Sequence, residues 1–234
     1  MLKKAKPLYA EKDSPFFRLR TKRKLADLLF SNVGKLISLS RGGNHYHSFP
    51  KAKKNGGYRM IDAPRGDLKA IQTRIAELLQ RIAPPAFLFA PVRGRSYVDN
   101  GARHMGARVF RLLDIEDFFP SCTAERVIWL FKTRLECSPD VAAILRGLVT
   151  RSGCLPQGSP CSPILAYLSY VDMWGEIDRL VCGQSCTLSV YADDITISGK
   201  FISENLIWSI KRILHKYGHR YNRKKERSLV GRPA

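Results

Sequence analysis

Two adjacent aspartates between two stretches of alternating polarity constrain this chain more than any other feature of its sequence. Asp193 and Asp194 stand between residues 188–191 and 195–198, which predicts two antiparallel strands with the acidic pair at the tip of a hairpin. Neighbouring carboxylates repel each other and raise each other's pKa unless a cation joins them. Mg²⁺ prefers oxygen ligands and takes one or two carboxylates together with phosphates. The pair therefore indicates either a divalent-metal site or a simple aspartate turn.

A third carboxylate lies in a different apolar stretch. Residues 109–115 are typical of a strand, and Asp114 lies near the end of this strand. If Asp114 lies beside the Asp193–Asp194 pair, the cluster can hold two ions about 4 Å apart, which is the arrangement for in-line phosphoryl transfer. We therefore expect Asp114, Asp193 and Asp194 to meet in space.

The positive charge of the chain is concentrated at its two ends. The 234 residues carry a net charge of +20, of which residues 1–60 hold +12 and residues 211–234 hold +8. The intervening residues are neutral as a set. This segregation favours a polyanionic partner, because Lys and Arg that neutralise phosphates release condensed counterions. A membrane surface and a merely solvated basic face are the alternatives.

The composition is typical of a globular protein without membrane spans. No apolar run approaches the roughly 20 residues needed to cross a bilayer. The basic start lacks the apolar core of a secretion signal. The six cysteines form no CxxC pair, which indicates free thiols in a reducing compartment. We therefore expect a cytoplasmic protein with no membrane contact.

Helix and strand signals alternate irregularly along the chain. An apolar face predicts a helix over 67–82, capped by Asp67, and Ser138 and Ser162 are each followed by proline as at a helix start. A further helix is expected from Ser203 to about Tyr217. The predicted strands are residues 58–62, 109–115 and 187–198. This mixture predicts an α+β fold around an antiparallel sheet with packed helices.

Four motifs in order resemble those of reverse transcriptases. Tyr191-Ala-Asp-Asp194 is similar to the signature hairpin of that family, and Asp114-Ile-Glu-Asp-Phe-Phe119 to its first metal-binding motif. Residues 153–160 (GCLPQGSP) resemble the motif between these two, and residues 53–64 (KKNGGYRMIDAP) resemble the basic fingers hairpin. The resemblance covers residues 50–230, with order and spacing both in agreement.

The resemblance implies the fingers and palm of a right-hand polymerase. It assigns residues 1–90 and 122–158 to the fingers and residues 91–121 and 159–234 to the palm. Relatives normally continue into a thumb that clamps the template–primer duplex, and we expect no thumb in this chain. A separate thumb-supplying chain, a truncated form and a natural minimal form remain open alternatives.

The resemblance also implies residue roles. Asp114, Asp193 and Asp194 would hold Mg²⁺, or Mn²⁺ in its place. Phe119 would exclude the ribose 2′-hydroxyl, and by strand alternation either Phe118 or Phe119, but not both, should reach the site. Glu226 stands where the family usually carries Thr, after the lysine that could protonate pyrophosphate. The expected nucleotide-binding residues are Lys53, Lys54, Arg59, Asp117, Phe119, Gln157 and Lys225.

Within the family, the chain most resembles the bacterial retron enzymes. Residues 92–104 are similar to the segment that retron enzymes carry ahead of the first Asp motif, with Gly101 where alanine is usual. Group II intron-like and other antiphage-defence reverse transcriptases are the alternatives. The expected RNA-binding residues in this segment are Arg93, Arg95, Asn100 and His104.

The function implied by these resemblances is RNA-directed DNA synthesis. A structured non-coding RNA would serve as template and primer, dNTPs as substrates, and a thumb-supplying or effector protein as partner in antiphage defence. A catalytically idle RNA-binding scaffold is one alternative. An RNA-templated RNA polymerase is another, against which Phe119 argues.

Overall fold

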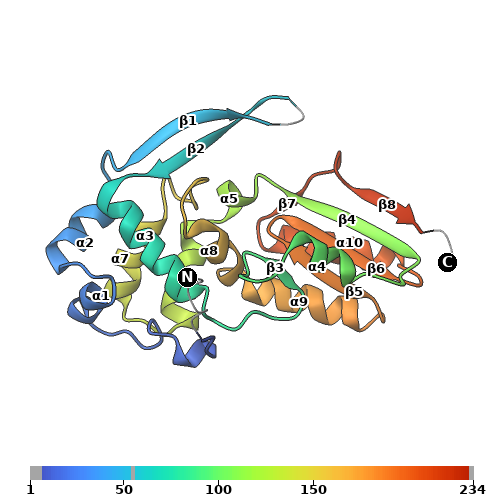
Figure 1. The fold of residues 1–234 in the computed structure, drawn as a ribbon, viewed down its shortest axis with the longest axis horizontal. Coiled ribbons are helices and arrows are strands. Elements are labelled where there is room, and N and C mark those ends of the chain that lie inside the picture. The colour runs from blue at the N-terminus through green and yellow to red at the C-terminus, as the bar shows by residue number, and fades with distance from the viewer. Residues whose placement is uncertain (1–6, 54–55, 232–234) are drawn as a thin grey trace, which may run out of the picture. The chain divides into compact units, whose positions relative to one another are not determined.

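The computed structural model describes residues 7–53 and 56–231 and divides the chain into two compact units (Figure 1). Unit 1 comprises Met1–Ala83 and Cys122–Ser169, and unit 2 comprises Pro84–Ser121 and Tyr170–Ala234. Each unit is therefore built from two stretches of chain that are distant in sequence.

Unit 1 is mainly helical, with one hairpin. Its hairpin pairs β1 (Tyr46–Ala52) with β2 (Tyr58–Pro64). The helical elements are η1 (Glu11–Asp13), α1 (Lys22–Leu28), α2 (Val33–Ser40), α3 (Gly66–Leu79), α6 (Ala124–Trp129), the π-helical turn η2 (Leu130–Arg134), α7 (Pro139–Val149) and α8 (Ser162–Leu168).

A buried glutamine joins three parts of unit 1. The apolar stripe of α3 packs inward, and Gln72 on the same helix is fully buried. Its amide nitrogen lies 2.8 Å from both the Tyr46 hydroxyl and the Leu148 carbonyl, and its oxygen accepts from Ser159. Because a buried amide without partners would destabilise the unit, these bonds fix β1, α7 and the loop before α8 against α3.

Unit 2 contains a mixed sheet with the order β3-β5-β6-β4-β7, in which β8 also pairs with β4. The β3–β5 pair is parallel and all other pairs are antiparallel, so the expectation of a purely antiparallel sheet was wrong at this one edge. The strands are β3 (Leu88–Ala90), β4 (Val109–Glu116), β5 (Thr187–Tyr191), β6 (Asp194–Gly199), β7 (Arg220–Tyr221) and β8 (Arg227–Val230).

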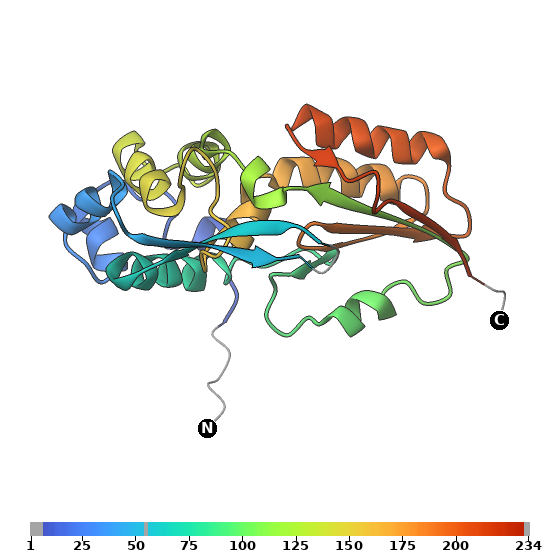
Figure 2. The ribbon, with the colours of Figure 1, turned by 90° about the horizontal axis from the view of Figure 1, so that it is seen from above.

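Helices cover the two faces of this sheet unequally. The long helices α9 (Val171–Cys182) and α10 (Glu204–Lys216) lie along one face, and the short α4 (Tyr97–Ala102) lies on the other (Figure 2). The core beneath α9 and α10 is apolar, with Trp174 and Ile210 fully buried. α5 (Phe118–Ser121) follows β4 directly. One face of the sheet is thus largely left to polar side chains.

Several predicted helix boundaries are confirmed and others move. α10 begins after its Ser203 cap and ends before Gly218, as predicted. The helix predicted over 67–82 is α3, which begins one residue earlier and ends at Leu79. Asp67 lies in its first turn and pairs with Lys35 instead of capping it. Ser162 is the first residue of α8, and its hydroxyl donates to the Pro156 carbonyl, which holds the preceding loop.

Across residues 7–53 and 56–231, no helix is both long and apolar enough to span a bilayer.

Candidate active site

The three carboxylates predicted to meet all lie in unit 2, on neighbouring strands. Asp114 on β4 stands directly opposite Asp194 on β6. Asp194 is the first residue of β6 and pairs with Tyr191, so the turn itself consists of Ala192 and Asp193. The N–H of Ile115 donates to the Asp193 carbonyl at 3.0 Å, which ties the turn to β4. The register of three strands thus sets the positions of all three residues.

The electrostatics of this cluster favour a cation. Partial burial, and after it the charges of Asp193 and Asp114, raises the pKa of Asp194 to about 6. The ammonium of Lys225 donates to the buried carboxylate of Asp114, and this bond raises the pKa of Lys225. The Lys225 ammonium therefore neutralises part of the negative charge of the three carboxylates.

The donor set fits a hard divalent cation, because the cluster offers carboxylate oxygens, and because burial and then the neighbouring carboxylates penalise the charged form of Asp194. In the part of the chain that the structure describes, no three acidic, histidine or cysteine side chains are already arranged as a metal cage. Lys225 holds one oxygen of Asp114. The residues that would bind the metal are present, with a side-chain cation among them.

The loop that carries Lys225 is anchored on both sides. The N–H of Asn222 donates to the Asp114 carbonyl at 2.7 Å. Glu226, which replaces the usual Thr, accepts from Lys211 at 2.8 Å and from Arg111 at 3.1 Å. Glu226 therefore has a structural role, because together with Glu204 it binds Arg111, which is almost fully buried in the sheet.

Phe118 and Phe119 follow β4. The prediction that strand alternation places their rings on opposite faces was wrong in its premise. Both residues lie in helix α5 and not in a strand, so strand alternation does not apply. Phe118 is buried against His219, with ring centroids 5.9 Å apart, and Phe119 remains partly exposed. Asp117 is exposed and adopts a φ of 44°, where the chain turns from β4 into α5. Phe119 is thus the ring that is open to solvent.

The four residues expected to bind RNA differ in how far unit 2 encloses their side chains. Arg93 is exposed, but the guanidinium of Arg95 donates to the carbonyls of Pro85 and Leu88. His104 is buried, with both ring nitrogens 2.7 Å from serine hydroxyls. Protein atoms thus bind both ring nitrogens of His104 and one guanidinium nitrogen of Arg95, and the expected RNA contacts of these two residues stay predictions.

The fourth residue of that set is also partly enclosed. Asn100 is half-buried on α4, and its side-chain oxygen is shielded from solvent with no hydrogen-bond partner among the described residues. Of the four residues predicted to bind RNA, Arg93 alone has an exposed side chain.

The predicted nucleotide-binding residues of the hairpin belong to unit 1. Arg59 on β2 is exposed and pairs with Lys51 across the hairpin, and the N–H of Lys53 donates to the Gly57 carbonyl. Lys54 lies outside the described residues. The hairpin therefore displays its basic side chains to solvent.

The Gln157–Gly158 loop packs closely against β2 within unit 1. The Asp62 N–H donates to the Gln157 carbonyl at 2.6 Å. Gly158 adopts a φ of 119°, and a Cβ there would lie 2.8 Å from Ile61 Cγ2. Only glycine fits this backbone without strain, which gives a physical reason for its place in the motif.

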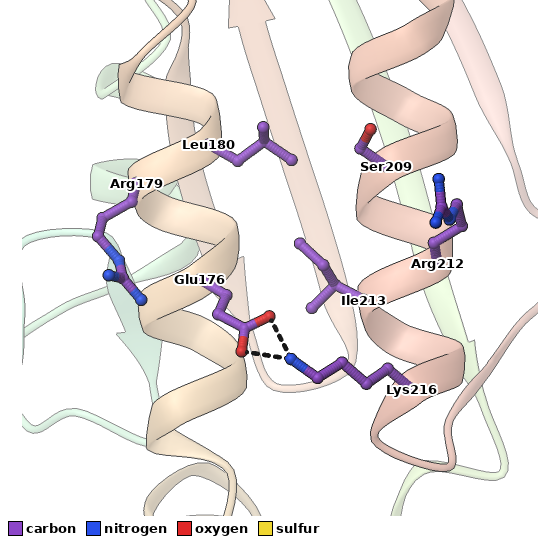
Figure 3. A pocket seen from close by; sticks show the side chains of 7 residues that line it. All are labelled: Glu176, Arg179, Leu180, Ser209, Arg212, Ile213 and Lys216. Carbon is purple, nitrogen blue, oxygen red and sulfur yellow. Dashed lines mark hydrogen bonds and ion pairs between the residues drawn. The ribbon is translucent and has the colours of Figure 1, made fainter.

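A groove between α9 and α10 is separate from these residues. It encloses about 650 Å³, and its seven lining residues include none of the predicted site residues. Glu176 and Lys216 form an ion pair across it at 2.8 Å (Figure 3). The bonds from Lys216 and Tyr217 lower the pKa of Glu176. This ion pair links the two helices that cover the sheet.

Comparison with known proteins agrees with this geometry. The family described as "Reverse transcriptase (RNA-dependent DNA polymerase)" matches residues 50–230. The chain belongs to the reverse transcriptase family. The match includes β2, β4 and the Asp193–Asp194 turn, and it begins within β1.

Curated relatives of this reverse transcriptase family member include retron enzymes. The chain is 33% identical over 170 residues to the Retron Se72 reverse transcriptase of Salmonella heidelberg (strain 579083-10), covering 72% of this chain and 45% of the relative. It is 34% identical over 236 residues to the Retron Mx65 reverse transcriptase of Myxococcus xanthus (89% and 55%). It is 30% identical over 158 residues to the Retron Ec86 reverse transcriptase of Escherichia coli (66% and 49%). The chain spans about half the length of these relatives.

Proposed function

We propose that this chain is the fingers and palm of a retron-type, RNA-directed DNA polymerase. The observation that carries the proposal is the register of the sheet, which sets Asp114 opposite Asp194 and ties Asp193 to β4. In this assignment unit 1 corresponds to the fingers and unit 2 to the palm. Membership of the reverse transcriptase family supports the reaction, and likeness to retron enzymes supports the subclass.

The three carboxylates would bind two Mg²⁺ ions, or Mn²⁺ in their place. When bound, these ions activate the primer hydroxyl and neutralise the triphosphate. Asp114 is buried at the end of β4, which keeps its carboxylate in a fixed position. Lys225 would exchange its bond with Asp114 for one with the nucleotide, where its ammonium can donate a proton to the departing pyrophosphate.

The remaining residues of the proposed site select and orient the dNTP. The Arg59 guanidinium suits bidentate contact with phosphate oxygens, and Lys53 and Lys54 add point charges. Phe119 would exclude the 2′-hydroxyl of a ribonucleotide, and Asp117 would contact the triphosphate through its backbone. Gln157 would line the nucleotide pocket, since its carbonyl bond to Asp62 fixes the loop that carries it.

The proposed template is a structured non-coding RNA, and the proposed setting is antiphage defence with an effector protein or a thumb-supplying chain as partner. The positive charge of the two chain ends supports RNA binding through phosphates. Arg93 is the exposed residue of the retron-like segment that can join this contact.

The test compares incorporation of dNTPs and NTPs on a primed RNA by the wild-type chain and by Asp193→Asn. We expect Mg²⁺-dependent incorporation of dNTPs by the wild type only. No incorporation by the wild type would favour an idle RNA-binding scaffold, and preferred use of NTPs would favour an RNA polymerase. Either result would overturn the proposal.

A further inference from the structure

His104 lies on the sheet of unit 2 between the two strands of the Asp193–Asp194 hairpin. Its Nδ1 is 2.7 Å from the Ser198 hydroxyl on β6, and its Nε2 is 2.7 Å from the Ser189 hydroxyl on β5. The side chain is 5% exposed. One imidazole thus bridges both strands of the hairpin.

The bridge lies on the same face of the sheet as the catalytic carboxylates. Side chains two residues apart on a strand share a face, so Ser198 shares its face with Asp194 on β6. Asp114 stands opposite Asp194, and Phe110, four residues earlier on β4, also contacts the His104 ring, with centroids 6.5 Å apart. A change in the bridge would therefore be transmitted along β6 to the carboxylates without crossing the apolar core.

The imidazole of His104 is suited to a fixed bridge. Burial, and after it the charge of Arg103, lowers the pKa of His104 below its usual value. A neutral imidazole has one N–H that donates and one nitrogen that accepts. Each serine therefore has a defined partner role, and rotation of either hydroxyl would break a buried hydrogen bond.

The segment that carries His104 is itself anchored to the hairpin. The Arg103 Nε donates to the Leu188 carbonyl at 2.8 Å. Helix α4 begins with a capping box, in which Ser96 and Asp99 each accept from the other's backbone N–H. The bridge is thus supported from β5 on one side and from a capped helix on the other.

We propose that His104 is a positioning residue. By bonding to both β5 and β6, it fixes the position of the hairpin and of Asp193 and Asp194 at its turn. The proposal rests on the proposed function. It gives this residue of the retron-like segment a task inside the protein in place of contact with RNA. In this proposal His104 acts through its bonds with Ser189 and Ser198.

The first experiment separates hydrogen bonding from packing. His104→Leu replaces the imidazole by an apolar side chain of similar size and leaves the hydroxyls of Ser189 and Ser198 without their bonds to His104. We expect kcat for dNTP incorporation to fall by about tenfold, with little change in KM. The triple variant His104→Leu/Ser189→Ala/Ser198→Ala removes all three polar groups together. We expect its melting temperature to return toward wild type while kcat stays low.

His104→Gln tests the rescue. A glutamine amide supplies one donor and one acceptor, as a neutral imidazole does, so this variant should retain more kcat than His104→Leu. His215→Leu on α10 is the matched control, because His215 is exposed and its loss should change neither quantity. If kcat recovers with stability in the triple variant, His104 only fills space and the proposal is wrong.

A readout independent of catalysis distinguishes this proposal from the proposed function. Amide hydrogen exchange of residues 187–198 should be faster in His104→Leu and in the triple variant than in the wild type. Unchanged exchange in both variants would overturn the bridge. If the wild-type chain incorporates no dNTP, the proposed function fails, while the exchange experiment still decides whether His104 holds the hairpin.

Discussion

The sheet of unit 2 and the β1–β2 hairpin of unit 1 present charged groups in opposite ways. In the sheet, β4 and β6 are each paired on both sides, and the Asp114 carboxylate is buried between them. In the hairpin, only Pro64 of the paired residues is buried, and the basic side chains extend into solvent. Metal ligands need fixed positions, whereas a cation that attracts a triphosphate acts over several ångströms. We therefore expect substitutions in the sheet to change kcat and substitutions in the hairpin to change KM.

The largest expected effect is loss of catalysis from the sheet. Asp114→Asn should lower dNTP incorporation by on the order of a thousandfold, because a neutral amide is a poor ligand for a divalent cation. The melting temperature should not fall in parallel, since the substitution removes one of three mutually repelling charges. Single-turnover extension and thermal unfolding measure the two quantities, and activity within tenfold of wild type would contradict the assignment.

Phe119→Ala tests the aromatic residue next to the sheet. Removing the ring should reduce the preference for dNTPs over NTPs by roughly a hundredfold, because the steric exclusion of the 2′-hydroxyl is lost. The ratio of kcat/KM values for dCTP and CTP measures the preference. Phe118→Leu is the control, because Phe118 is buried and should affect stability more than selectivity. An unchanged ratio in Phe119→Ala would remove this residue from the site.

Arg59→Ala tests the hairpin. We expect KM for dNTPs to rise about tenfold with a smaller change in kcat, because a charged contact to the triphosphate is lost from an exposed side chain. Lys69→Ala on α3 removes one exposed positive charge elsewhere in unit 1 and controls for net charge. Equal effects of the two substitutions would show that the hairpin contributes only general electrostatics.

Gly158→Ala tests how the hairpin is anchored. The new Cβ would lie 2.8 Å from Ile61 Cγ2 and 3.1 Å from the Asp62 carbonyl oxygen, at a φ of 119°. We expect the free energy of unfolding to fall by about 1–3 kcal/mol, with a higher KM for dNTPs. Denaturant unfolding and steady-state kinetics check the prediction. A wild-type KM would mean that the loop does not set the position of β2.

The smallest expected effect is a pH dependence of stability in the sheet. Because the pKa of His104 is lowered in the folded state, the unfolded chain takes up this proton first as the pH falls. Stability should therefore decrease as the pH drops below about 6.5, the ordinary value for histidine. His104→Gln should flatten this slope in denaturant unfolding at pH 5.5 and 7.5. An equal slope in wild type and variant would assign the effect to other groups.

The three carboxylates could be identified from the sequence because each lies in a short pattern that is typical of a strand or a hairpin turn. Asp114 ends an apolar strand and Asp193–Asp194 interrupt an alternating one, so both signals lie within a few residues. The pairing of β4 with β6 joins residues about eighty positions apart, and sequence alone does not fix that register. The surroundings of His104 could not be predicted in this way. Its two partners, Ser189 and Ser198, are more than eighty residues away in the sequence, and no local pattern indicates that His104 is buried between them.

Local rules failed where two signals competed. Alternation assigned Phe118 and Phe119 to a strand, but the chain turns at Asp117 into α5. Asp67 and Ser162 have the chemistry of helix caps, yet Lys35 and the Pro156 carbonyl bind them instead. In these cases the partner or the turn that decides the outcome lies outside the short pattern used for the prediction.

The short loop between Asn222 and Glu226 affects how the charge of the acidic cluster is balanced when no metal is bound. The Asn222 N–H is bonded to β4 and the Glu226 carboxylate to Arg111 and Lys211, so both ends of the loop are held while the Lys225 ammonium balances the charge of Asp114. The fold thus carries its own exchangeable counter-charge. If the cluster binds magnesium as proposed, the folded sheet does not depend on that ion for its charge balance, and chelation should abolish dNTP incorporation while leaving the melting temperature unchanged.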